Sequence, residues 1–389
     1  MMHCTPLSHF TRLALCLAAA GALAACGTTP TPPSGTAAAP TTDVAATTAQ
    51  VRRAEIAPAL YELAFSPRQN AVFVASAGGF GDDAPASKVL RLNPDTLAIE
   101  AEITLPLRGF GVVLDDAQDR LYVSHGLDGA ISVIDTASGR IIGRIALAAK
   151  VRGADGKEKF EHHFRELVLD AAHHRLYAPG LSSEGSALYV INTRTLQLEK
   201  VMDGFGPVAT GIALDAAGQR LFVSNLRGNL YEVDTQNLTV AQSHSVGADQ
   251  LINLAYDTRG QRLLATDQGL DAINARRQAS EPGFVPTPGN RVVVFDPATA
   301  AITASIPTGA GPIALLLDEA RQRLFVTNRG AGTVTVFDAR SHALLQTFEL
   351  PKHPNSLAFD ARRNVLYVSV KNGREAERGG AESVVRIAF

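Results

Sequence analysis

The stretch RLFVTNRGAGTVTVFD, residues 323–338, decides the fold, because close copies of it occur elsewhere in the chain. Similar phrases are RLYVSHGLDGAISVID at 120–135 and RLFVSNLRGNLYEVD at 220–234. Each phrase is typical of a strand, a turn that contains Gly or Asn, and a second strand. A phrase that occurs three times indicates a structural building block rather than a catalytic motif.

The repeated frame extends beyond this phrase. An apolar strand ending in Asp precedes a polar turn and Arg-Leu-(Tyr/Phe)-Val-(Ser/Thr), and two further strands follow. The frame occurs seven times, around the anchors Phe73, Tyr122, Tyr177, Phe222, Leu264, Phe325 and Tyr367. The anchors are 42 to 55 residues apart, except for one gap of 61 that contains an insertion. Four alternating strands per repeat predict one propeller blade for each copy.

The two ends of the repeat region complement each other. The last copy has only three strands and ends in SVVRIAF (383–389), while VRRAEIA (51–57) precedes the first copy. We therefore predict an all-β, seven-bladed β-propeller of four-stranded antiparallel blades, closed by an N-terminal strand that completes the last blade. The Asp at the end of each first strand is predicted to accept backbone N–H hydrogen bonds in the next turn.

The composition places few limits on function. The chain has 389 residues, of which 46% are hydrophobic, and its formal net charge is −2. The apolar content suffices for a large core, which the mature fold needs because all three cysteines lie within the first 26 residues. The charge balance argues against a strongly basic nucleic-acid-binding protein, although it is compatible with a local basic patch.

The first 50 residues are predicted to lie outside the fold. Residues 1–26 combine a weakly basic start, an apolar run and small residues before Cys26, which predicts a signal peptide. Residues 27–50 are mainly Thr, Pro and Ala and predict a disordered tether, so that the propeller spans 51–389.

The end of the signal, Leu23-Ala24-Ala25-Cys26, resembles the lipobox of bacterial lipoproteins. That resemblance implies lipidation of Cys26, and a following Gly27 instead of Asp favours the periplasmic side of the outer membrane. Cleavage as an ordinary export signal, which would leave a soluble periplasmic protein, is the alternative.

The repeated phrase resembles the YVTN-repeat propellers. The resemblance narrows to YncE-type periplasmic propellers at YELAFS (61–66), FRELVLD (164–170), HPNSLA (353–358), LYVSVK (366–371) and VVRIAF (384–389). It covers essentially all of 51–389 and implies seven blades, no known enzymatic activity and an association with single-stranded DNA. The chain contains no Trp and therefore lacks the residue that would give a strong stacking surface. The lipobox and tether suggest a membrane-anchored variant of a normally soluble form.

The loops expected on one face of the propeller combine aromatic and cationic residues. Such a mixture suits an unpaired nucleic acid, because bases stack on rings and cations neutralise phosphates. The alternative is that the Phe residues fill the wedges between blades and the charges, which include carboxylates, are solvated. The predicted ligand-binding residues are Arg108, Phe110, Phe164, Arg165, Arg329, Lys352, His353 and Asn355, the last to hydrogen-bond the ligand or fix the His353-Pro354 turn.

A second candidate set lies four residues before each strand-ending Asp. It consists of Glu62, Gly111, Glu166, Gly211, Asn253, Ala314 and Ser356. If these residues face the central channel, Glu62, Glu166 and Asn253 offer oxygen ligands for Ca²⁺ or another divalent cation, as in a lactonase-like hydrolase. Hydrogen bonding to channel water or to Arg165 is the alternative. No G-x-S-x-G elbow or other catalytic motif was found.

The favoured hypothesis is a monomeric, non-enzymatic binding module that needs no cofactor. Its predicted partner is single-stranded nucleic acid or another polyanion, with a cell-envelope protein as the alternative. The segment 267–290 is expected to be a structureless loop, either a lid or contact loop or a tolerated insertion.

Overall fold

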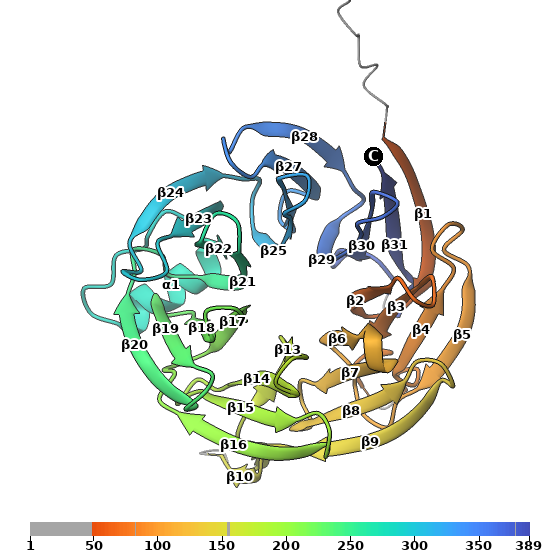
Figure 1. Ribbon diagram of the computed structural model, residues 1–389, viewed down its shortest axis with the longest axis horizontal. Helices are drawn as coiled ribbons and strands as arrows, with labels where there is room; N and C mark the ends of the chain where they lie inside the picture. The colour runs from red at the N-terminus through yellow and green to blue at the C-terminus, as the bar shows by residue number, and fades with distance from the viewer. Residues whose placement is uncertain (1–48, 82, 154–155, 378) are drawn as a thin grey trace, which may run out of the picture. The chain divides into compact units, whose positions relative to one another are not determined.

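The computed structural model describes residues 49–389 except 82, 154–155 and 378, within a compact unit formed by Thr47–Phe389. The predicted signal, Cys26 and nearly all of the predicted tether lie outside the described residues. Seven sheets surround a central channel, as Figure 1 shows. No helix among the described residues is long and apolar enough to cross a membrane.

Each sheet is antiparallel, and its first strand lies at the channel while its fourth lies at the rim (Figure 1). This confirms the predicted seven blades of four strands. Blade one contains β2 (Leu60–Ser66), β3 (Ala71–Ser76), β4 (Lys88–Leu92) and β5 (Ile99–Thr104). Blade two contains β6 (Val112–Asp115), β7 (Arg120–His125), β8 (Ala130–Asp135) and β9 (Arg140–Ala146). Blade three contains β13 (Val168–Asp170), β14 (Arg175–Leu181), β15 (Ala187–Asn192) and β16 (Gln197–Asp203), with β12 (His163–Phe164) beside β14.

The later blades repeat this order, and blade seven includes the N-terminal strand. Blade four contains β17 (Ala209–Asp215), β18 (Arg220–Asn225), β19 (Asn229–Asp234) and β20 (Thr239–Ser245), and blade five contains β21 (Leu251–Asp257), β22 (Arg262–Asp267), β23 (Arg291–Phe295) and β24 (Ile302–Pro307). Blade six contains β25 (Pro312–Asp318), β26 (Arg323–Asn328), β27 (Thr333–Asp338) and β28 (Leu344–Glu349). Blade seven contains β29 (His353–Asp360), β30 (Val365–Lys371), β31 (Glu382–Ala388) and β1 (Gln50–Ala57).

The chain ends close the ring as predicted. Strand β1 runs antiparallel to β31, with Gln50 opposite Ala388 and Arg53 opposite Val385. Because β31 is thereby paired on both sides, the last blade presents no unpaired edge there.

The repeated Asp has the predicted role in the turn. Asp215 Oδ1 accepts a hydrogen bond from Gly218 N at 2.9 Å, and its Oδ2 binds Arg220 Nη2 at 2.7 Å. The Arg of the repeated phrase thus returns to the Asp that precedes it. Equivalent backbone hydrogen bonds are accepted by Asp115, Asp170, Asp257, Asp318 and Asp360.

The Ser or Thr of the repeated phrase has a role that the sequence did not reveal. Ser369 Oγ donates to Tyr61 O at 2.6 Å and joins the last blade to the first. The side chain therefore connects each such blade to the first strand of its neighbour. Corresponding bonds link Ser124 to Arg165 O, Ser224 to Leu251 O, Thr266 to Ile313 O and Thr327 to Asn355 O.

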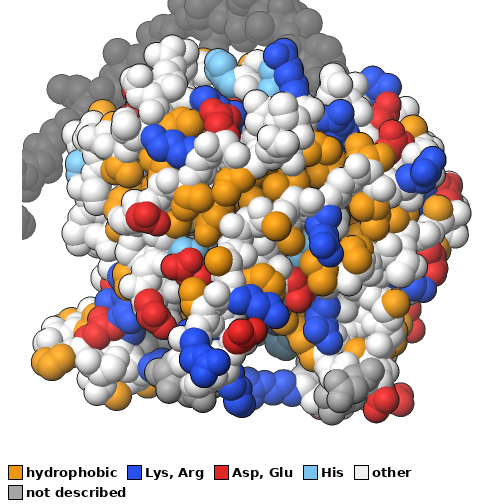
Figure 2. Space-filling view, turned by 90° about the horizontal axis from the view of Figure 1, so that it is seen from below, with side chains coloured by type: hydrophobic (Ala, Val, Ile, Leu, Met, Phe, Trp, Pro, Cys, Tyr) orange, Lys and Arg blue, Asp and Glu red, His pale blue; other side chains and the backbone are white. Residues whose placement is uncertain are grey.

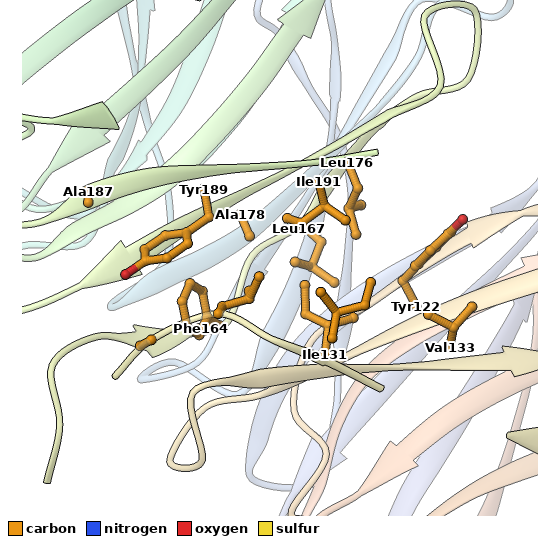
Figure 3. Close-up of a cluster of buried hydrophobic side chains, with 13 residues drawn as sticks. Tyr122, Ile131, Val133, Phe164, Leu167, Leu176, Ala178, Ala187, Tyr189 and Ile191 are labelled. Carbon is orange, nitrogen blue, oxygen red and sulfur yellow. The ribbon is translucent and has the colours of Figure 1, made fainter. Parts of the chain in front are cut away.

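Apolar side chains fill the wedges between blades. Figure 3 shows the cluster between blades two and three, in which Phe164 packs against Tyr189 with their ring centroids 4.9 Å apart. Apolar side chains also form a band along the rim that carries β9 and β16 (Figure 2), where Ile142 is 46% exposed. The same view shows charges of both signs in patches, so this side has no field of a single sign.

Two insertions differ from a plain propeller. The segment 267–290 was predicted to be a structureless loop, and this prediction is wrong because the segment contains α1 (Asp271–Ser280). Arg277 of α1 is buried, binds Asp249 at 3.1 Å and Glu281 at 3.0 Å, and lies over the Phe284 ring. In the connection between β9 and β12, β10 (Lys150–Arg152) and β11 (Glu158–Phe160) form a short hairpin that is a separate two-stranded sheet.

Candidate functional site

A cavity of about 480 Å³ occupies the channel at the end where the first strands begin. Two successive rings of side chains line it. Each ring consists of the residues at one position of the repeat, and the two positions are consecutive in the sequence. The outer ring is Tyr61, Phe110, Arg165, Thr210, Ile252, Ile313 and Asn355; the inner ring includes Glu62, Glu166, Asn253, Ala314 and Ser356. The cavity therefore combines cations, carboxyl groups and aliphatic walls, as sites for small organic ligands do.

Glycine makes the close approach of the first strands possible. A Cβ atom on Gly111 would lie 1.8 Å from the carbonyl oxygen of Arg165, and one on Gly211 would lie 2.2 Å from Leu254 Cδ1. These two glycines occupy the same repeat position as Glu62 and Glu166. A side chain is thus present at that position only where the neighbouring strand leaves room for it.

Three cations gather around Tyr61 at the cavity mouth. Lys371 Nζ lies 3.9 Å and Arg165 Cζ lies 5.9 Å from the centroid of the Tyr61 ring. Arg329, from the β26–β27 turn, donates to Asn355 Oδ1 at 3.4 Å and lines the same cavity. The convergence of strands from blades one, three, six and seven creates this cluster.

The cluster carries more positive than negative charge. Lys371 pairs with the buried Glu382 at 3.1 Å, whereas the ion pairs among the described residues include neither Arg165 nor Arg329. Burial, and then the charge of Arg165, lower the pKa of Arg329. Two guanidinium groups near each other, neither in an ion pair among the described residues, form a site that an anion would stabilise.

The carboxyl groups below the mouth form a hydrogen-bonded pair. Glu62 Oε2 accepts from Val112 N at 2.9 Å, and Glu62 and Glu166 share a side-chain hydrogen bond. Asn253 Nδ2 donates to Glu166 Oε2 at 3.2 Å, and Asn253 Oδ1 accepts from Leu315 N at 3.0 Å. The bond of Glu62 to Val112 N connects blade one to blade two, and the bond of Asn253 to Leu315 N connects blade five to blade six.

Burial changes the protonation of this pair. It raises the pKa of Glu166 to about 7, although the charge of Arg165 lowers it. The pKa of Glu62 is raised well above its ordinary value, first by burial and then by the charge of Glu166. Near neutral pH the pair therefore holds at least part of a proton between its two carboxyl groups.

An aromatic surface adjoins the cavity. A second hollow of about 420 Å³ is lined by Tyr61, Phe80, Phe110 and Arg165, among other residues. Phe80 is 49% exposed and lies 6.3 Å from Phe110, while Arg108 lies over its ring at 5.8 Å. Phe80 thus offers an exposed ring beside the cationic mouth.

The two predicted phenylalanines are not at the surface. Phe110 is 5% exposed and Phe164 is completely buried, the latter in the wedge shown in Figure 3. Phe164 therefore cannot stack on a base in this structure, and the stacking role predicted for it is wrong, whereas Phe110 is largely buried but lines both cavities. They pack against Tyr61 and Tyr189, which supports the alternative that they fill gaps between blades.

The other predicted residues divide into two groups. Arg165, Arg329 and Asn355 line the cavity together with Phe110. The remaining three lie outside its lining: Arg108 donates to Gly79 O at 3.0 Å, Lys352 is exposed and pairs with Glu375, and His353 Nδ1 contacts Arg329 O at 2.8 Å.

The predicted metal ligands do come together. Glu62, Glu166 and Asn253 line the same cavity, but the described residues contain no group of three or more His, Cys, Asp or Glu that could hold a metal ion. A cation at this position would have two carboxyl groups and one amide, with the proton between the carboxyl groups displaced.

Sequence reasoning missed Tyr61 and Glu382, and it counted Lys371 among the cations of the loop face without including it in the predicted binding residues. Tyr61 could have been found by moving the comparison of repeats by one residue, since its ring of equivalents lines the mouth. Glu382 gave no such signal, because it lies after an irregular loop and approaches Lys371 only through the pairing of β31 with β30.

Comparisons with known proteins give relatives over most of the chain. A protein from Salmonella typhimurium, described as the uncharacterized protein YncE, is 33% identical over 343 residues, which cover 87% of this chain and 90% of the relative. The YncE protein of Escherichia coli K12, with the same description, is 30% identical over 346 residues, covering 87% of this chain and 91% of the relative.

No family model matches the chain. Among solved structures, hydrazine synthase from Kuenenia stuttgartiensis has a TM-score of 0.63 at 14% sequence identity. The match covers 81% of this chain and 93% of the other. At this level of identity the likeness concerns the fold.

Proposed function

Because the chain belongs to the YncE family of seven-bladed propellers, we propose that it is a binding protein for a flexible polyanion, with single-stranded nucleic acid as the first candidate. The observation that carries this proposal is that Arg165 and Arg329 line the channel mouth together, and neither forms an ion pair among the described residues. Phosphate groups would supply the missing negative charge, and guanidinium groups bind phosphate through two parallel hydrogen bonds.

The aromatic surface beside the mouth supports a nucleic acid over a simple polyanion. Phe80 and Tyr61 line one hollow with Arg165, so a base could stack while its phosphate is neutralised. Stacking on an aromatic side chain contributes about 1–3 kcal/mol per base. Phe80 takes the stacking role that the sequence had assigned to Phe164.

The salt dependence of binding tests this function. Fluorescence anisotropy of a labelled 20-residue dT strand would be measured with the purified protein over a series of salt concentrations. Each phosphate contact adds about 0.7 to the slope of log affinity against log salt for a single strand. We expect Arg165→Ala and Arg329→Ala each to weaken binding and to reduce that slope by about one contact.

Arg140→Ala is the matched control, because Arg140 is an exposed arginine at the start of the rim strand β9. Its removal should leave affinity and slope unchanged. The polyanion proposal fails if the protein does not bind the strand at low salt, or if all three variants behave alike.

The location of the protein belongs to the same proposal. A lipid on Cys26 and a tether of residues 27–50 would hold the propeller on the periplasmic side of the outer membrane. Replacing Cys26 with Ser should move the protein from the membrane fraction to the soluble fraction. Unchanged membrane association in this variant would contradict the lipid anchor.

A divalent cation at Glu62, Glu166 and Asn253 ranks below this function. Burial favours the protonated form of the two carboxyl groups, so a cation must first displace a proton. The hydrolase alternative would require added Ca²⁺ to raise the melting temperature, and Glu166→Gln to abolish that increase.

A further inference from the structure

We propose that the channel-mouth cavity binds the terminal nucleotide of a single strand, with its phosphate at Arg165 and Arg329 and an amino group of its base at Glu166 and Asn253. This inference rests on the proposed polyanion function and adds a preference for strand ends and for certain bases. All four residues line the same cavity, so one small molecule can contact both groups.

Below its mouth the cavity is crossed by the hydrogen-bonded side chains of Glu62, Glu166 and Asn253, which come from blades one, three and five. The position after the carboxyl pair contributes Leu63, Val112, Leu167, Leu315 and Leu357 to the lining. A volume of about 480 Å³ lies within the usual range for one small organic ligand. An internal nucleotide would require the strand to enter and leave through the same mouth, whereas a terminal nucleotide requires a single passage.

The mouth provides the contacts for a terminal phosphate. Asn355 holds Arg329 through a hydrogen bond of 3.4 Å, and Tyr61 lies beside Arg165. A terminal phosphate carries more charge than an internal phosphodiester, because its second ionisation has a pKa near 6. It therefore gains more than an internal phosphate from two guanidinium groups that lack a carboxylate partner.

The inner ring mainly offers acceptors to a base. Besides the hydrogen bond that Glu62 and Glu166 share, Glu62 Oε2 accepts from Val112 N, Glu166 Oε2 from Asn253 Nδ2, and Asn253 Oδ1 from Leu315 N, so a base would use the second lone pairs of these oxygens. Carboxyl groups with raised pKa values carry less than two full negative charges near neutrality, so they repel the phosphate less. Acceptors of this kind suit the amino groups of adenine and cytosine, which thymine lacks.

Linear and circular strands separate this inference from the function on which it rests. The probes are a 5′-phosphorylated 20-residue dT strand, the same phosphorylated strand with dA at both ends, and the ligated circle of the latter. We expect the linear dA-ended strand to bind about tenfold more tightly than its circle. Equal affinity for the two would overturn the inference and leave the polyanion function intact, while binding of neither would overturn both.

Base preference provides the second readout. The strand with terminal dA should bind more tightly than the all-dT strand, and Glu166→Gln should reduce this difference because an amide offers one acceptor and adds a donor. Asn253→Ala should reduce it as well, whereas Arg140→Ala should preserve it. Free dAMP should compete with the linear strand; the absence of competition would contradict nucleotide binding in the cavity.

Discussion

Asn253 Nδ2 donates a hydrogen bond to Glu166 Oε2 at 3.2 Å, linking blade five to blade three across the channel. Glu166 in turn shares a hydrogen bond with Glu62 of blade one. A chain of three polar side chains thus connects three blades beneath a mouth that carries unpaired arginines. This arrangement makes both stability and binding sensitive to the protonation of the carboxyl pair.

The first prediction concerns stability and pH. Folding raises the pKa of Glu166 from 4.5 to about 7, so the folded state keeps a proton that the unfolded state has released. The free energy of unfolding should therefore fall as pH rises from about 5 to 8, by about 1–3 kcal/mol. Glu166→Gln mimics the protonated form and should weaken this fall, with a higher melting temperature than the wild type at pH 8.

Thermal unfolding of both proteins at pH 5 and pH 8 would measure this difference. The two melting temperatures should be closer at pH 5, where wild-type Glu166 is protonated. Parallel pH profiles for wild type and variant would show that the pair does not titrate as inferred.

The second prediction concerns contacts between blades. Ser369→Ala removes the donor to Tyr61 O and leaves Ser356 N without its acceptor. Because both groups are at a buried blade junction, the loss should cost about 1–3 kcal/mol in chemical denaturation. Ser243→Ala on the exposed rim strand β20 is the control and should cost less than about 0.5 kcal/mol. Equal costs would remove the special role of the repeated Ser.

The third prediction concerns the glycines beside the carboxyl pair. In Gly111→Ala the new Cβ would collide with Arg165 O, so blades two and three must move apart. We expect a loss of about 1–3 kcal/mol and weaker strand binding through displacement of Arg165. Gly185→Ala meets no atom within 4 Å and should be nearly neutral in both assays.

The fourth prediction concerns the insertion that contains α1. Arg277 joins Asp249, Glu281 and Phe284, so Arg277→Ala should loosen residues 267–290 while the blades stay folded. Hydrogen exchange should accelerate in this segment by about tenfold or more. The neighbouring Arg276 is exposed, so Arg276→Ala should have little effect on exchange. A uniform increase in exchange rate over the whole chain in Arg277→Ala would contradict local anchoring.

The repeated phrase contained enough information to predict the architecture. Seven copies of the first strand, its turn and the following strand, at similar spacing, predicted the number of blades. The missing fourth strand of the last copy and the extra strand before the first copy identified β1 as the partner of β31. The insertion at 267–290 was mistaken for a structureless loop because it has little helical periodicity and begins without a capping side chain.

The site was only partly predictable. Arg165, Arg329 and Asn355 were identified as binding residues and do meet in one cavity. Phe164 was misassigned because its position in a loop predicts exposure, whereas the loop forms β12 and turns the ring into the wedge. Sequence spacing also could not show which cations have carboxylate partners, since Lys371 and Glu382 meet through the pairing of β30 with β31 across an irregular loop.

Binding of labelled single-stranded DNA over a salt series, with wild type, Arg165→Ala, Arg329→Ala and Arg140→Ala, is the experiment on which the proposed function depends. We predict binding that weakens with salt, a smaller slope in the two mouth variants, and wild-type behaviour in Arg140→Ala. If the wild type binds no strand at low salt, or if the mouth variants bind as tightly as Arg140→Ala, then the arginines at the channel mouth are not a polyanion site.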